Sequence, residues 1–247
     1  MKKLSLLLTA LIIISFTLLD KKSYTQEKFQ LQKKNYIWNI DNESIQLPFK
    51  DLSGIWKIES ISTNEYKFAL TQKLQYIDFT KLLSEKSFYD FTFTAKIYLK
   101  EDENIKKLNK KESASSKKDK EYYEEDESIA AGLIFRYRNN FKYYMIFIDA
   151  TENEIDLIRN NYGKKIIKKI NYTIDNNKWY KLSIKCYLDE IVVSLDDKEM
   201  YRINDSASTG GKIGLVTYKR TTAYFNDLTL ETEVVSTSKG DILQDEQ

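Results

Sequence analysis

Two carboxylates, Glu154 and Asp156, stand two residues apart in the segment NEIDLIR. Because alternate side chains of a β-strand point to the same face, this spacing predicts that the two carboxylates share a face while Ile155 and Leu157 point the opposite way. Paired carboxyl groups carry out glycoside hydrolysis, and retaining enzymes hold the two groups about 5–5.5 Å apart. The segment offers no further acid to protonate a leaving group. We therefore favour a solvent-facing row of a strand over a catalytic pair.

The chain has no histidine and one cysteine. The missing histidine excludes Ser-His-Asp and Cys-His mechanisms and His-ligated zinc. Cys186 lies in the strand-like segment KLSIKCYL, on the same predicted face as Leu182 and Ile184. One thiol cannot form an intrachain disulfide, and we predict a buried, apolar cysteine rather than a nucleophile.

Arginines and aromatic residues alternate along several predicted strands and are the candidates for binding. An arginine fork can hydrogen-bond sugar hydroxyls or carboxylates while aromatic rings stack on apolar sugar faces. Six residues are predicted to line one concave sheet in this way: Arg136, Tyr144, Arg159, Trp179, Tyr218 and Arg220. The alternative is that Trp179 and one tyrosine of each pair belong to the core and that Arg136 pairs with a carboxylate across strands.

Composition and periodicity predict an all-β domain. The chain has 18 Tyr and 12 Phe but a single Pro, and aromatic residues suit strands. Apolar and polar residues alternate in about twelve short segments, the pattern of a β-sandwich or jelly roll. Residues 54–60 and 65–72 predict a hairpin, and 89–100 predicts a strand. Seven further strands are predicted at 129–138, 142–150, 153–160, 164–172, 178–188, 190–197 and 199–205.

The stretch from Gly210 to Glu231 gives the clearest local pattern. Two alternating runs, KIGLVTYK and TAYFNDLTLE, flank a short link at residues 220–222, and we predict that they form a β-hairpin. Glycines at 210, 211 and 214 would permit a tight turn and a close approach of the backbone.

The remaining segments predict how the chain is divided. Residues 1–23 have two lysines followed by an apolar run and are predicted to be a signal peptide, with no stable membrane span after its removal. Residues 24–49 are predicted to be an extended arm, and 50–233 the domain. The charged run at 101–128 is predicted to be a disordered loop insertion, and 234–247 a disordered tail. A net charge of +2 from charges of both signs predicts a solvated surface and no nucleic-acid partner.

The order of the segments resembles the concanavalin A-like lectin/glucanase superfamily, especially the laminin-G-like group that includes 3-keto-disaccharide hydrolase-like domains. The resemblance covers about residues 50–233. It is carried by Gly-Leu-Ile-Phe-Arg at 132–136, Tyr-Tyr-Met at 143–145, Trp-Tyr-Lys-Leu at 179–182, Gly-Lys-Ile-Gly-Leu at 211–215 and Phe-Asn-Asp-Leu at 225–228. It implies a jelly-roll β-sandwich, a fold that hosts sugar binders, protein binders and hydrolases.

The resemblance also bears on two candidate sites. Some laminarinase-type glycosidases of this fold carry E-x-D-x-x-E along one strand, and here the closing position is Arg159, so the motif is incomplete. Many domains of the group hold Ca²⁺ with loop carboxylates and carbonyls, and Asp227 is the candidate ligand here, with Asp149, Asp196, Asp197 and Asp205 as further acids at strand ends. A turn-forming role is the default interpretation for Asp196, Asp197 and Asp205.

We therefore expect a secreted, non-catalytic β-sandwich that binds a glycan or a glycosylated protein in an extracytoplasmic compartment: the periplasm, the cell surface or a secretory compartment. No cofactor is required, although Ca²⁺ is compatible with the resemblance. One alternative is a disaccharide-type hydrolase of the same fold. The other is a protein-interaction domain of a surface or vacuolar complex. Three Asn-x-Ser/Thr triplets, at Asn42, Asn171 and Asn204, would matter only in a cell that glycosylates secreted proteins.

Overall fold

The alternating segments form strands of two antiparallel sheets. The computed structural model describes residues 30–74, 79–101, 128–219 and 221–236. Residues 33–233 form one compact unit, which contains the core of the sandwich. The strands are β1 (Gln30–Trp38), β2 (Phe49–Ser53), β3 (Trp56–Ser60), β4 (Phe68–Gln72), β5 (Phe79–Phe88), β6 (Phe91–Lys100), β7 (Ala130–Asn139), β8 (Lys142–Asp149), β9 (Glu154–Asn161), β10 (Lys164–Asn171), β11 (Trp179–Tyr187), β12 (Glu190–Leu195), β13 (Lys198–Asn204), β14 (Gly211–Tyr218) and β15 (Thr222–Ser236).

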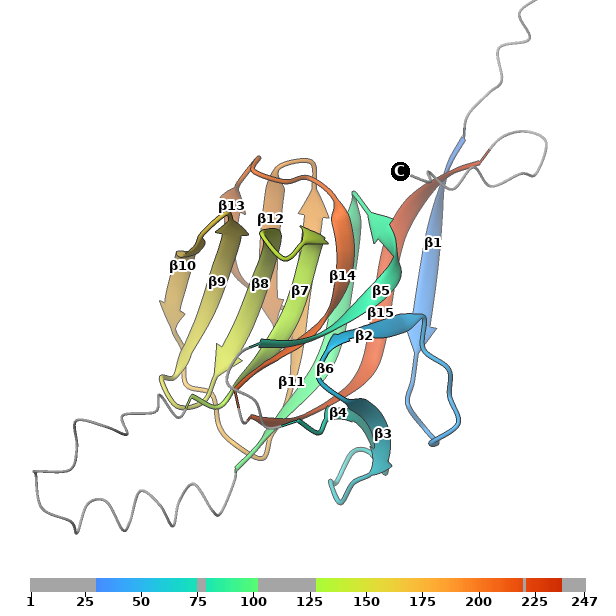
Figure 1. The fold of residues 1–247 in the computed structure, drawn as a ribbon, viewed down its shortest axis with the longest axis vertical. Helices are drawn as coiled ribbons and strands as arrows, with labels where there is room; N and C mark the ends of the chain where they lie inside the picture. Colours follow the sequence, from blue (N-terminus) through green and yellow to red (C-terminus); the bar gives the residue numbers. More distant parts are fainter. Residues whose placement is uncertain (1–29, 75–78, 102–127, 220, 237–247) are drawn as a thin grey trace, which may run out of the picture. The chain divides into compact units, whose positions relative to one another are not determined.

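The two sheets pack face to face as a sandwich (Figure 1). One sheet has seven strands in the order β10-β9-β8-β7-β14-β5-β2. The other has eight, in the order β13-β12-β11-β6-β15-β4-β3, with β1 also pairing with β15. In the view of Figure 1 the seven-stranded sheet lies in front. No helix among the described residues is long and apolar enough to cross a membrane.

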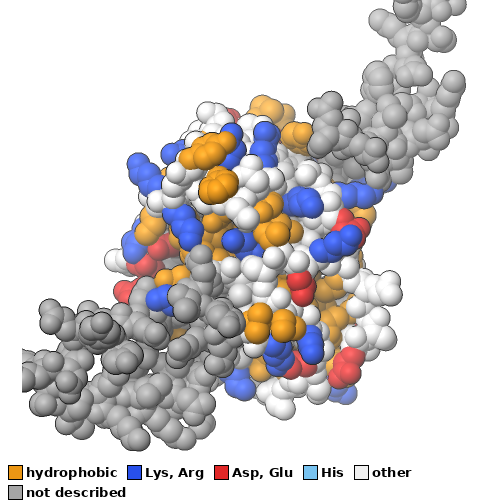
Figure 2. Space-filling model, viewed as in Figure 1, with side chains coloured by type: hydrophobic (Ala, Val, Ile, Leu, Met, Phe, Trp, Pro, Cys, Tyr) orange, Lys and Arg blue, Asp and Glu red, His pale blue; other side chains and the backbone are white. Residues whose placement is uncertain are grey.

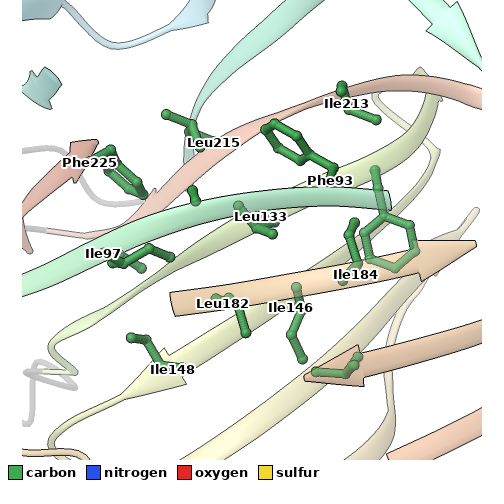
Figure 3. Close-up of a cluster of buried hydrophobic side chains, with 14 of the residues drawn as sticks. Phe93, Ile97, Leu133, Ile146, Ile148, Leu182, Ile184, Ile213, Leu215 and Phe225 are labelled. Atoms are coloured by element: carbon green, nitrogen blue, oxygen red, sulfur yellow. The ribbon is translucent and has the colours of Figure 1, made fainter. Parts of the chain in front are cut away.

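The core lies between the sheets and follows from the period of two. In β6, Phe93, Ala95, Ile97 and Leu99 are completely buried, as the alternation predicted. Side chains from both sheets converge there, including Leu133 and Ile146 of the seven-stranded sheet and Leu182 and Ile184 of the eight-stranded sheet (Figure 3). Full burial of each large apolar side chain stabilises the fold by about 1.5–3 kcal/mol. Cys186 is also buried here, which confirms its predicted environment.

The predicted hairpin of residues 210–231 is wrong. β14 pairs with β5 and β7 in the seven-stranded sheet, whereas β15 pairs with β6 and β4 in the other. At the link the Thr221 N–H donates to the Tyr218 carbonyl at 3.1 Å, and the chain passes from one sheet to the other. Both strands bury one apolar face in the same core. Their alternation therefore predicted the buried faces correctly but could not distinguish partners in one sheet from neighbours in facing sheets.

Three strands were not predicted. β1 lies within the predicted arm, β2 overlaps the start of the domain, and β5 occupies a stretch that we left unassigned. The predicted hairpin of β3 and β4 is confirmed, with Trp56 opposite Gln72. The predicted signal peptide and nearly all of the predicted insertion and tail lie outside the described residues.

Candidate functional site

The outer face of the seven-stranded sheet carries a second apolar cluster, separate from the core. It contains Leu83, Ala130, Ile134, Tyr137, Tyr143, Met145, Phe147 and Val216, with Phe79, Ile158 and Tyr218 packed against them. Phe79 and Tyr218 are only partly buried, and their ring centroids lie 4.9 Å apart. Figure 2, drawn in the same view as Figure 1, shows hydrophobic side chains interspersed with lysines, arginines and a few acids on this side of the molecule.

The outer face is concave. β5 and β8 are separated by β14 and β7, which would place β5 and β8 about 14 Å apart in a flat sheet. Nevertheless, the Phe79 and Phe147 ring centroids are 5.4 Å apart, and Lys81 Nζ lies 5.4 Å from the Tyr143 ring centroid. Lys164 of β10 lies five strand spacings from β5, about 24 Å in a flat sheet, yet its Nζ is 4.3 Å from the Phe79 ring centroid. Side chains cannot close so wide a gap unless the sheet curves toward this face.

Glu154 and Asp156 lie on this concave face. Asp156 is opposite Phe147 of β8 and Lys169 of β10, and opposed residues of paired strands share a face. Ile155 and Leu157 are buried in the core, so the predicted alternation is confirmed. The prediction that the acids face solvent is only partly right, because their side chains are 10% and 14% exposed. Lys169 Nζ lies 2.6 Å from Glu154 Oε1 and 3.8 Å from Asp156 Oδ2.

Asp156 is electrostatically unusual. Burial, followed by the charge of Glu154, raises the pKa of its carboxyl from 3.8 to about 6, against the opposing effect of Lys169. Its Oδ1 atom is buried and has no hydrogen-bond partner among the described residues. A carboxyl with this pKa exchanges its proton near neutral pH, which is the property required of a general acid or base.

The structure does not supply a third acid at the end of this row. Arg159, which the sequence places at the closing position of the glycosidase motif, points between the sheets and contacts Asp205. The residue that follows Asp156 on the concave face is Ile158. Neither side chain can donate a proton to a leaving group, so the incomplete motif of the sequence is also incomplete in three dimensions.

Three of the six predicted binding residues gather around Asp205, at one end of the sandwich. Arg159 Nη1 donates to Asp205 Oδ2 at 2.6 Å, and the Tyr144 hydroxyl donates to Oδ1 at 2.8 Å. Arg136 donates to the backbone carbonyls of Leu188, Glu190 and Asp205. Burial raises the pKa of Asp205, but hydrogen bonds from the Ala207 N–H and from Tyr144, together with Arg159, hold it below its usual value.

This arrangement corrects the prediction of one shared binding sheet. Arg136 has no exposed surface and Tyr144 is 1% exposed, so neither lines an open face. Arg136 points inward because it has a φ of +48° at a bulge in β7, which breaks the alternation that the sequence assumed. Instead of pairing with a carboxylate, its guanidinium contacts backbone carbonyls of the opposite sheet.

The other three predicted residues lie apart. Trp179 is in the eight-stranded sheet, where it packs against Tyr66 and Tyr98 and is 7% exposed, so its alternative assignment as a packing residue is correct. Tyr218 lies on the concave face beside Phe79. Arg220 is outside the described residues. Of the five that the structure describes, only Tyr218 lies on the concave face with the acids.

Calcium binding at Asp227 stays a prediction. Asp227 accepts a hydrogen bond from the Tyr66 hydroxyl. In the described part of the chain, no group of three or more acidic, cysteine or histidine side chains could hold a metal ion. Asp205 accepts a hydrogen bond from the Ala207 N–H, which is the turn-forming role that we took as its default. Asp149 likewise accepts hydrogen bonds from the N–H groups of Thr151 and Glu152.

Sequence reasoning missed the β5 side of the concave face. Phe79, Lys81 and Leu83 alternate along β5 and face the same side. This period of two was the available signal, but the apolar pair Leu82-Leu83 and the polar run after it obscured the pattern. Phe147 was missed because its strand is apolar on both faces, so the sequence could not identify its outer side.

Comparisons with known proteins bear on the fold. No family model and no curated protein matches the chain. The carbohydrate binding module CBM66 from Bacillus subtilis superposes with a TM-score of 0.56 at 22% identity, covering 75% of this chain and 96% of that one. A Bacillus subtilis protein of unknown function with a galectin-like fold gives 0.54 at 10% identity, covering 82% and 99%. Crh5 transglycosylase in complex with NAG gives 0.52 at 7% identity, covering 81% and 87%.

At these identities the comparisons establish the fold alone. The narrower laminin-G-like assignment stays a prediction. Two facing antiparallel sheets in this topology, together with these structural matches, show that the chain has the concanavalin A-like jelly-roll fold.

Proposed function

We propose that the protein binds a carbohydrate on the concave face of the seven-stranded sheet and does not cleave it. The observation that carries the proposal is the pairing of partly exposed rings with charged groups on a curved surface. Phe79 and Tyr218 offer ring faces for stacking on a sugar. Asp156 and Lys169, a few strands away, offer an acceptor and a donor for hydroxyl groups.

The structural matches support carbohydrate as the ligand class. One is named as a carbohydrate binding module, and another as a transglycosylase in complex with NAG. Their low identity carries no residue-level information, so the proposed contacts rest on the geometry of this chain. The non-catalytic part of the proposal rests on the positions of Ile158 and Arg159, which leave the acid pair without a third carboxyl group.

The first test is a glycan array probed with the full chain, followed by titration of any glycan that binds. We expect Tyr218→Ala to weaken binding about tenfold, because it removes a stacking ring. Asp156→Asn should also weaken binding while preserving the shape of the side chain. The matched control is Tyr187→Ala, which removes a 55% exposed tyrosine from the other sheet. Thermal melting would show that each variant is folded.

A blank array with folded protein would contradict the proposal and favour the protein-interaction alternative. Equal weakening by Tyr218→Ala and Tyr187→Ala would also contradict it, because binding would then not be localised to the concave face.

Hydrolysis is the second candidate, and the pKa of Asp156 favours it. A carboxyl with a pKa of about 6 beside Glu154 resembles an acid paired with a carboxylate. The test is release of reducing ends from any glycan that binds. Turnover that Asp156→Asn abolishes while binding is retained would establish this candidate. Unchanged glycan after prolonged incubation would support the non-catalytic proposal.

We also propose that the chain is secreted, on the basis of the apolar run that follows Lys2 and Lys3. N-terminal sequencing of the exported protein should show that about the first 23 residues have been removed. Retention of this segment in a protein that stays inside the cell would contradict the proposal.

A further inference from the structure

Two turns at one end of the seven-stranded sheet present exposed aromatic rings in nearly the same sequence setting. Residues 138–142 read RNNFK and residues 159–164 read RNNYGK. Phe141 is 60% exposed, and Tyr162, at 73%, is the most exposed large apolar side chain of the described residues. The two rings are nearly parallel, with an interplanar angle of 9° and centroids 6.1 Å apart.

The turns hold these rings outward by a fixed set of hydrogen bonds. The Tyr162 N–H donates to the Phe141 carbonyl at 2.9 Å, and Asn160 Nδ2 donates to the Asn140 carbonyl at 3.1 Å. Tyr162 has a φ of +56°, in the left-handed region that bulky residues rarely adopt and that asparagine or glycine occupies more easily. Because Tyr162 buries little of its ring, packing does not explain why a tyrosine occupies this strained backbone position.

The charge around the two rings is positive. Arg138, Lys142 and Lys165 flank them in the sequence, and neither turn contains an acid. Lys164 also lies in the second turn, but its Nζ is 4.3 Å from the Phe79 ring centroid on the concave face. Lys142 Nζ lies 5.1 Å from the Tyr162 ring centroid. The neighbouring turns at this end carry Asp90, Asp189 and Asp205, of which Asp205 is paired with Arg159. The local excess of positive charge therefore lies on the two turns that carry the rings.

More exposed apolar side chains occur at the same end of the sandwich, the upper end in Figure 1. Tyr89 is 56% exposed and Leu188 is 59% exposed. Leu188 is tied to this end because its N–H donates to Asp90 Oδ1 at 2.8 Å and its carbonyl accepts from Arg136. Hydrophobic side chains and lysines or arginines are visible together at this end in Figure 2.

We propose that this end docks on an anionic lipid surface, with Phe141 and Tyr162 entering the headgroup region. Tyrosine and phenylalanine at the tips of turns suit a membrane interface, where the ring is desolvated and the tyrosine hydroxyl stays hydrated. The flanking cations complement anionic headgroups, and each contributes about fivefold to affinity. The rings project from turns rather than lining a hollow, which fits a deformable surface better than a small ligand.

The test measures insertion of the turn itself. Tyr162→Trp in the full chain is mixed with vesicles of brominated phosphatidylcholine, with and without phosphatidylserine. We expect the emission of the new tryptophan to be quenched beyond that of the three native tryptophans, and only with phosphatidylserine present. The matched control is Leu52→Trp, which replaces a 44% exposed residue on the edge strand β2, beside Lys81 and Leu82 of β5 and away from the two turns. Because quenching is local, membrane binding by the apolar N-terminal segment does not imitate this result.

Further variants in the Tyr162→Trp background test the two parts of the proposal. Phe141→Ser should lower vesicle-dependent quenching about tenfold at limiting lipid, through loss of buried apolar area. Lys165→Glu should lower it by at least about fivefold, whereas the exposed control Lys57→Glu should leave it unchanged. Quenching that is absent in Tyr162→Trp, or equal in Tyr162→Trp and Leu52→Trp, would overturn the proposal. Glycan binding at the concave face would be unaffected by any of these results.

Discussion

At the scale of single residues, the chemistry of this chain depends on which buried carboxylates have hydrogen-bond donors or cations beside them. Asp205 accepts hydrogen bonds from Tyr144 and Arg159, and its pKa is lowered. Asp156 is also largely buried, but it has an unpartnered oxygen and a negative neighbour, and its pKa is raised. The first acid therefore stabilises the fold when it is ionised. The second stabilises the fold only when it is protonated.

Asp156→Asn should change how stability depends on pH. The folded pKa of about 6 lies above the ordinary value of 3.8. The stabilising contribution of Asp156 is therefore fully present below pH 3.8 and is lost as the pH rises through about 6. Compared with Asp156→Asn, the wild-type free energy of unfolding should fall across this window, which urea denaturation at a series of pH values would measure.

The control for this experiment is Asp175→Asn, because the Asp175 side chain is exposed. It should follow the wild type at every pH. If the curves of the wild type and Asp156→Asn stay parallel between pH 3.8 and about 6, the carboxyl is not perturbed as described.

At the scale of elements, close contacts between strands depend on glycines in the middle of the seven-stranded sheet. A Cβ atom at Gly214 of β14 would lie 1.8 Å from the Leu82 carbonyl oxygen of β5. At Gly132 of β7 it would lie 1.7 Å from the Ile146 carbonyl oxygen of β8. The predicted close approach of the backbone is thus confirmed at Gly214. The pairing of β14 with β5 and of β7 with β8 requires glycine at positions 214 and 132.

Gly214→Ala should therefore destabilise the protein by about 3 kcal/mol or more, because a carbonyl in a paired strand cannot move away cheaply. Gly163→Ala is the matched control, since no atom lies within 4 Å of its added Cβ. That substitution should change the unfolding free energy by less than about 1 kcal/mol. Chemical denaturation of both variants would measure the difference, and similar stability in the two would argue against the close approach.

At the scale of the whole molecule, the two sheets are joined by one core and by a buried polar contact at one end. Arg136 extends from β7 of the seven-stranded sheet to the turn between β11 and β12 of the other sheet. Buried charges are expensive unless they are hydrogen-bonded, and three carbonyls compensate this one. The residue that seemed best suited to bind a sugar instead connects the sheets.

Arg136→Leu should cost about 3 kcal/mol of unfolding free energy, because it leaves buried carbonyl oxygens without a donor. The control is Arg138→Leu, which removes an exposed arginine two residues away and should cost less than about 1 kcal/mol. Unfolding followed by near-UV and far-UV circular dichroism would report both values. Equal stability of the two variants would show that the buried contact does not hold the sheets together.

The sequence by itself determined most of the strands and the faces that they bury. The alternation in β6 specified Phe93, Ile97 and Leu99 as core residues, because a strand that buries one face must repeat with a period of two. The order of the segments was specific enough to indicate the jelly roll. It also placed Glu154 and Asp156 on one face and indicated that their motif was incomplete.

Only the tertiary structure decided which strands are neighbours and where the exceptions point. β14 pairs with β5, more than a hundred residues earlier in the chain, as the 2.6 Å contact between the Thr80 and Thr217 hydroxyls illustrates. Local alternation carries no information about such distant partners. Arg136 itself has a left-handed backbone conformation at the β7 bulge, and this turns its side chain inward. The curvature of the sheet brings the Phe79 ring next to the Phe147 ring. Both depend on packing between segments that are far apart in the sequence, which is why the proposed binding face could not be read from the sequence alone.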